Sequence, residues 1–71
     1  MRWGSAPARR VLRALERIGW QEVRSRATHR VLRRGGWPDF IFSFHMSEEI
    51  GPVMLARIAK RTGLEPEDLQ G

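Results

Sequence analysis

Apolar residues recur at helical spacing in two stretches of the chain, with polar residues between them. The apolar positions of the first stretch are Val11, Leu12, Leu15 and Ile18. Pro7 suits the first turn of a helix and Gly19 suits its C-terminal cap. This stretch therefore predicts a helix over residues 8–18.

The second stretch begins at Pro52 and ends at a Gly63 cap. It runs through Leu55, Ile58, Ala59 and Thr62 at helical spacing. Lys60 and Arg61 occupy the last turn, where cations interact favourably with the negative end of the helix dipole. We expect a second helix here and one further helical turn over residues 64–69.

Three runs between these helices are typical of short strands. They cover residues 20–24, 30–33 and 40–44, and the third is rich in aromatic residues. Residues 25–28 are short enough for a hairpin connection. Residues 35–39 read Gly-Gly-Trp-Pro-Asp and predict a turn, because glycine allows positive φ and proline interrupts a strand ladder.

The predicted order α-β-β-β-α indicates a two-layer α+β fold. Three antiparallel strands form the sheet and both helices cover one of its faces, which leaves the opposite face open. We expect a single domain over residues 1–71, with residues 1–7 as a loose lead-in and residues 46–49 as a loop. A domain of this size buries only about 60% of the surface that its unfolded chain exposes, so its core must be compact.

Side chains alternate across a strand, so the pattern also predicts which residues lie on the open face. If Leu32 and the phenylalanines of the third strand face the helices, the open face carries His29, Val31, Arg33, Ile41, Ser43 and His45. A one-residue slip or a bulge would reverse this assignment. Trp20 and the phenylalanines are expected in the core, and Trp37 at the edge of the core.

The charge of the chain indicates its possible partners. There are 13 Lys and Arg residues against 8 Asp and Glu, for a net charge of +5, and Lys60 is the single lysine. The guanidinium group binds phosphate oxygens through a planar fork of donors, so an Arg-rich domain is a candidate binder of nucleic acid or of an acidic protein. Thermal stability or GC-rich coding would also enrich arginine. The apolar runs are too short for a membrane span or a signal peptide, and we expect a cytoplasmic protein.

The sequence restricts the chemistry available to the chain. It contains no cysteine, and His29 and His45 have no carboxylate at ligand spacing, so no metal site is predicted. No Gly-x-Ser-x-Gly hydrolase motif is present either. Acid–base chemistry by histidine remains, because imidazole can take a proton from a ribose 2′-hydroxyl while arginines offset charge on the phosphate. The alternative is that both histidines are ordinary surface residues.

Four segments together resemble a known family. They are residues 15–20 (Leu-Glu-Arg-Ile-Gly-Trp), 26–30 (Arg-Ala-Thr-His-Arg), 45–52 (His-Met-Ser-Glu-Glu-Ile-Gly-Pro) and 55–64 (Leu-Ala-Arg-Ile-Ala-Lys-Arg-Thr-Gly-Leu). Their order and spacing are similar to those of the HicA-family toxins over residues 10–69. In that family a helix ends in a Gly-aromatic pair and a strand then begins at Gly-Ser-His. The chain departs from the pattern at Ala27-Thr28, at Ser43 and at Val53.

The resemblance implies a fold like that of double-stranded-RNA-binding domains and cleavage of mRNA without a metal or other cofactor. The family's catalytic histidine corresponds to His29, and the implied protein partner is an antitoxin of the HicB type that covers the active face. On this hypothesis the chain is an endoribonuclease, with His45 as the second catalytic candidate. The candidate RNA contacts are Arg24, Arg26, Thr28, Arg30 and Arg33. A binding module that holds RNA without cleaving it, or a domain that binds an acidic protein, are the alternatives.

Overall fold

The computed structural model describes residues 2–70 and contains a three-stranded sheet, a two-stranded sheet, two α-helices and one 3₁₀ helix. The elements in order are β1 (Ala6–Pro7), α1 (Ala8–Arg17), β2 (Gln21–Arg26), β3 (His29–Arg33), β4 (Phe40–Ser43), β5 (Glu49–Ile50), α2 (Pro52–Thr62) and η1 (Pro66–Leu69). The predicted α-β-β-β-α order is confirmed, and two short strands are added to it. In residues 2–70 no helix is long and apolar enough to cross a bilayer.

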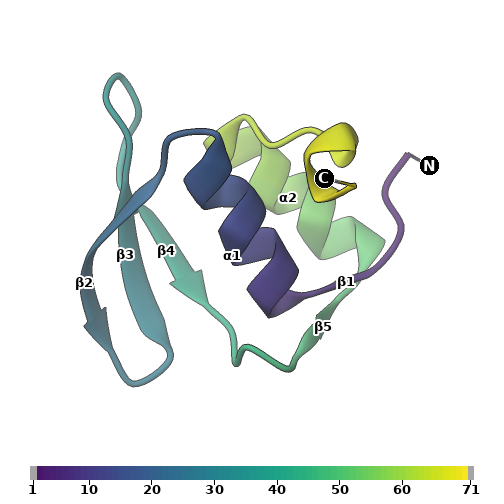
Figure 1. The fold of residues 1–71 in the computed structure, drawn as a ribbon, viewed down its shortest axis with the longest axis horizontal. Helices are drawn as coiled ribbons and strands as arrows, with labels where there is room; N and C mark the ends of the chain where they lie inside the picture. The colour runs from purple at the N-terminus through teal and green to yellow at the C-terminus, as the bar shows by residue number, and fades with distance from the viewer. Residues whose placement is uncertain (1, 71) are drawn as a thin grey trace.

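Strands β2, β3 and β4 form an antiparallel sheet in that order. Both helices lie on the same side of this sheet, with α1 and α2 running beside each other (Figure 1). The two-layer α+β arrangement is therefore confirmed. Within residues 2–70 no helix or further strand covers the other face of the sheet, so its side chains project into solvent.

The core lies between the sheet and the helices. Leu32 and Phe42 supply it from the sheet and are fully buried, as are Leu15 and Leu55 of the helices. Trp20 is also buried, and its indole Nε1 donates a hydrogen bond to the Thr62 carbonyl at 3.0 Å. This bond ties the start of the sheet to the end of α2, and it satisfies the one polar group that the indole brings into the core.

Two residues of the expected N-terminal lead-in, Ala6 and Pro7, form strand β1. Ala6 pairs with Ile50 as β1 meets β5, and each of these residues is only 2% exposed. The backbone N–H groups of Ala8 and Arg9 donate to the carbonyls of Glu48 (2.8 Å) and Met46 (3.1 Å). The segment expected to be a loop therefore satisfies the free N–H groups at the start of α1, where no side chain caps the helix. Two-residue strands have no periodicity from which the sequence could have predicted them.

The hairpin between β2 and β3 is tighter than predicted. β2 extends to Arg26 and β3 begins at His29, so only Ala27 and Thr28 form the connection. The register shifts between Glu22 and Arg24, which makes Val23 the extra residue of a β-bulge. Because the bulge lies in β2, the alternation of β3 and β4 is undisturbed and the predicted inner and outer residues of these two strands are confirmed.

Trp37 covers the edge of the core, as predicted. Its ring packs edge-on against Trp20 with 6.0 Å between ring centroids. The Arg34 guanidinium lies 5.3 Å from the centre of the Trp37 ring. The turn of residues 35–39 thus folds back over the layer between sheet and helices.

Candidate functional site

The open face of the sheet carries three rows of side chains, and the first row contains the candidate catalytic histidine. His29 begins β3 and is exposed, with Arg26 of β2 opposite it on one side and Ser43 of β4 on the other. Directly opposed residues of an antiparallel pair have Cβ atoms about 4.5–5.5 Å apart and lie on the same face. The row therefore places a cation, an imidazole and a hydroxyl side by side.

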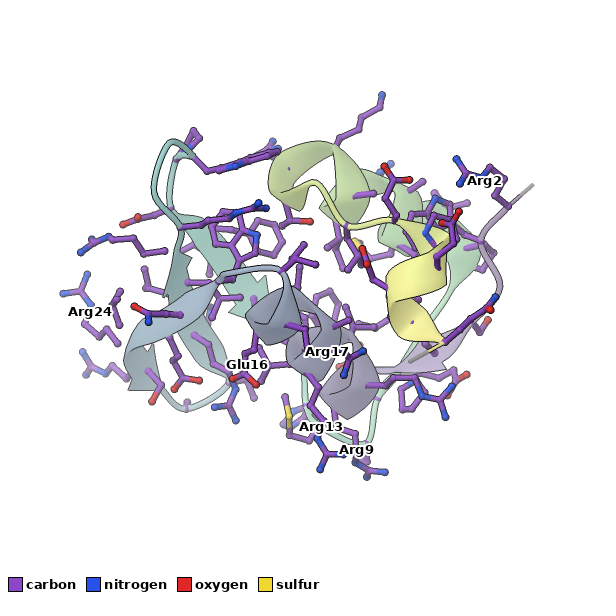
Figure 2. All side chains as sticks on the ribbon, turned by 45° about the horizontal axis from the view of Figure 1, so that its top comes forward. Arg2, Arg9, Arg13, Glu16, Arg17 and Arg24 are labelled. Carbon is purple, nitrogen blue, oxygen red and sulfur yellow. The ribbon has the colours of Figure 1, made fainter. Side chains whose placement is uncertain are left out.

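The second row is largely apolar. Val31 lies between Arg24 and Ile41, and Ile41 is 50% exposed. Arg24 points away from the helices at the outer side of the sheet (Figure 2). An exposed apolar strip beside cationic groups offers a surface on which a base or an apolar side chain can lie.

The third row is electrically neutral. Arg33 donates from Nε to Asp39 Oδ1 at 3.0 Å and from Nη2 to Oδ2 at 2.9 Å. The hydrogen bond from Arg33 holds the pKa of Asp39 below its ordinary value, and the nearby charge of Arg24 also lowers it. Arg33 therefore lies on the predicted face, but its charge is already compensated by Asp39.

Arg30 lies on the opposite face from His29. It pairs across the strands with Ser25 and with the buried Phe42, which places it on the side of the helices. Its Nη1 donates to Glu22 Oε1 at 3.1 Å, and the two side chains are only 27% and 29% exposed. The structure thus separates Arg30 from the candidate RNA contacts Arg24 and Arg26.

Thr28 forms the hairpin connection together with Ala27, next to His29. Ala27 has φ of +54°, and it is the one non-glycine residue with positive φ in residues 2–70. Glycine adopts positive φ without steric cost, whereas alanine does not. The chain therefore makes the left-handed turn before His29 with an alanine.

His45 lies two residues beyond the end of β4 and is exposed. Its backbone N–H donates to Glu48 Oε1 at 3.2 Å, and its carbonyl accepts from the Glu48 N–H at 3.0 Å. These contacts hold the backbone of His45 in a turn. His29, by contrast, is held within the sheet ladder.

Two residues of the open face were not among the sequence-predicted site residues. Ser43 was expected on the open face, but its position directly opposite His29 depends on the β3–β4 register. Asp39 was assigned to a turn, and its pairing with Arg33 follows from the path of that turn. Within residues 2–70 no group of three metal-ligating side chains comes together.

Comparison with known proteins identifies the family. No curated protein and no solved structure matches the chain. The family model described as the HicA toxin of bacterial toxin-antitoxin systems matches residues 8–64 of the 71-residue chain. The matched span runs from the start of α1 to the residue after the Gly63 cap of α2, and it includes the whole open face. The chain therefore belongs to the HicA family of toxins of bacterial toxin–antitoxin systems.

Proposed function

We propose that this toxin cleaves RNA on the open face of its sheet, with His29 as the general acid–base group. The observation that carries the proposal is the row Arg26–His29–Ser43, in which an exposed imidazole on a rigid strand lies between a cation and a hydroxyl. A strand holds a reactive side chain more firmly than a loop does. Family membership supports the same reading, since the chain is a toxin that must act on some cellular target.

The reaction needs no metal ion on this proposal. Neutral His29 removes the proton from a ribose 2′-hydroxyl, whose oxygen attacks the adjacent phosphorus and forms a 2′,3′-cyclic phosphate. The bond from phosphorus to the 5′-oxygen breaks, and the imidazolium or a water molecule returns a proton to that oxygen. Arg26 and Arg24 offset the negative charge that builds up on the phosphate. The Val31–Ile41 strip supports the neighbouring base.

Cleavage of a long mRNA by the purified chain, in the presence of a chelator, tests this proposal. The His29→Ala variant is expected to cut at least about a hundredfold more slowly, the low end for a general acid–base group. Its free energy of unfolding should change by less than about 0.5 kcal/mol, because the side chain is exposed and has no structural role. Circular dichroism and urea unfolding check that the fold is retained.

His45→Ala is the matched control, because it removes the second exposed histidine at a site outside the sheet ladder. We expect its cleavage rate to stay close to that of the parent. If His45→Ala loses activity and His29→Ala keeps it, the catalytic role belongs to His45. If the parent binds RNA but does not cut it in the chelator, the chain is a binding module and the nuclease proposal is wrong.

We further propose that an antitoxin of the HicB type inhibits the toxin by covering the open face. Ile41 supplies exposed apolar surface there, next to the free cations Arg24 and Arg26. A protein that buries Ile41 and places carboxylates near these arginines would exclude RNA from His29. Protection of Ile41 and His29 in the complex, measured by NMR, tests this placement.

A further inference from the structure

A groove rich in arginine runs along α1, on the helix side of the molecule rather than on the open sheet face. Its lining residues are Pro7, Arg9, Arg10, Arg13, Arg17, Leu69 and Gln70, and its volume is about 600 Å³. The side chains of Arg9, Arg13 and Arg17 follow one another along the exposed side of α1 (Figure 2). The end of the chain near η1 forms the opposite wall, so a sequence-based description of α1 alone could not show the groove.

The charges in this groove are not compensated. Within residues 2–70, no carboxylate lies within ion-pairing distance of Arg9, Arg10 or Arg13. Arg17 donates to the backbone carbonyl of Asp68 at 2.7 Å, which leaves its positive charge in place. Glu16 is the one acidic residue of α1, and it forms no ion pair in this part of the chain.

The positions of these arginines lower the stability of helix α1. Arg9 and Arg10 lie in the first turn of α1, which contains no acidic residue, and cations are unfavourable at the positive end of the helix dipole. Arg9 and Arg13 are four residues apart, as are Arg13 and Arg17, and like charges at this spacing repel each other. Folding therefore does not explain the cluster, whereas a bound anion would remove both unfavourable effects.

The chemistry of the groove fits a phosphate backbone better than a protein. Arginine in protein interfaces is most effective beside buried tryptophan and tyrosine, and among residues 2–70 no aromatic side chain lines this groove. Guanidinium groups one helical turn apart, about 6 Å along the axis, can each contact a separate phosphate. The groove between β4 and α2 is more apolar, since Phe40, Phe44 and Met54 line it together with Arg57 and Arg61.

We propose that the α1 groove is a second RNA-binding site, which holds the phosphate backbone of the RNA away from His29. The inference rests on the proposed function in that it takes RNA as the substrate, but it does not depend on His29 being catalytic. The groove adds affinity without taking part in bond cleavage. RNA bound there and at the open face would contact both sides of the molecule.

The test compares two double variants that lose the same charge. Arg9→Gln/Arg13→Gln alters the groove, and Arg2→Gln/Lys60→Gln removes two exposed cations that line neither this groove nor the open sheet face. The probe is a single-stranded 2′-O-methyl RNA, which cannot be cut because its 2′-oxygen cannot attack the phosphorus. Dissociation constants are measured for the parent and both variants over a series of salt concentrations.

The groove variant is expected to bind on the order of tenfold more weakly, and its slope of log K against log salt should be shallower by about 1.4, for two lost single-strand phosphate contacts. The control variant should show a clearly smaller change in both quantities. The melting temperature of the groove variant should equal or exceed that of the parent, because unfavourable charges have left the helix.

Three outcomes would overturn the inference. Equal losses for the two variants would show that only net charge matters, while the proposed nuclease function would stand. A groove variant that binds the RNA normally but no longer binds the antitoxin would make the groove a protein interface. A parent that does not bind the probe at all would contradict both the groove site and the RNA-directed function.

Discussion

Ala27 has the backbone conformation that glycine adopts most easily, and it does so immediately before the candidate catalytic residue. Its φ of +54° is imposed by the two-residue connection between β2 and β3. Short hairpin connections of this kind favour Gly, Asn or Asp at positions of positive φ. The local strain follows from the tertiary pairing of the strands, since alanine by itself would avoid this region.

Replacement of Ala27 by glycine should therefore stabilise the protein. Relief of the left-handed strain exceeds the entropy cost of glycine, so the free energy of unfolding should rise by about 0.5–1 kcal/mol. Urea unfolding at neutral pH measures the change. The matched control is Ala56→Gly in the interior of α2, which should lower stability by about 1 kcal/mol. A loss of stability in Ala27→Gly would mean that the turn is not strained.

The Arg33–Asp39 pair makes stability depend on pH in a predictable direction. Its hydrogen bonds lower the pKa of Asp39 from its ordinary value of 3.8. A carboxyl group whose pKa is lower in the folded state stabilises the fold above its unfolded pKa, and this contribution is lost as pH falls through the folded pKa. The urea midpoint of the parent should therefore fall on acidification more steeply than that of Asp39→Asn. In an Arg33→Gln background the same substitution should leave the pH dependence almost unchanged, and identical profiles in both backgrounds would contradict the pairing.

At the scale of elements, the end of α2 organises the edge of the core. Gly63 ends the helix with φ of +78°, and the Thr62 carbonyl before it accepts the Trp20 indole N–H. A Cβ at position 63 would lie 3.0 Å from Cη2 and 3.1 Å from Cζ2 of Trp37. The cap thus permits both the left-handed turn and the close approach of the turn that carries Trp37.

Gly63→Ala should accordingly destabilise the fold by more than about 1 kcal/mol, because left-handed strain adds to the displacement of Trp37. Tryptophan fluorescence should report greater solvent exposure of the displaced ring, and urea unfolding measures the loss of stability. Gly35→Ala is the matched control, since its Cβ would meet no atom within 4 Å. That variant should change stability by less than about 0.5 kcal/mol. Equal effects at the two glycines would rule out the role assigned to the Trp37 contact.

At the scale of the whole molecule, the cations that form no ion pair within residues 2–70 gather on three surfaces. Arg24 and Arg26 lie on the open sheet face beside His29, and the arginines of α1 line the groove on the helix side. The acidic residues neutralise other positions: Glu22 pairs with Arg30 and Asp39 with Arg33. The third group is Arg57, Lys60 and Arg61 on α2, which are exposed and form no ion pair within residues 2–70.

This distribution predicts that RNA binding weakens steeply with salt. Each neutralised phosphate of a single strand releases counterions and contributes about −0.7 to the slope of log K against log salt. The slope should be linear between low and physiological ionic strength, as measured by fluorescence anisotropy. Binding that stays flat over this range would indicate that RNA is not the ligand of these faces.

The sequence by itself determined the order of the main elements, the core and the two faces of the central strands. Each of these depends on local periodicity, which is visible in residues close together in the sequence. For example, Leu32 and Phe42 are buried, and His29 and Ser43 share the open face, as the alternation of β3 and β4 predicts. The family could also be recognised from the sequence, because the resemblance depends on the order and spacing of four segments along the chain.

Only the tertiary structure decided which charged side chains form ion pairs and which distant segments together form a groove. Alternation along β3 already places Arg30 and Arg33 on opposite faces, but only the packed structure shows that Glu22 compensates the first and Asp39 the second. The pairing of β1 with β5 and the wall that Leu69 adds to the α1 groove join segments from the two ends of the chain. Such contacts follow from the packing of the complete chain, because no local pattern of residues encodes which distant segment will lie beside another.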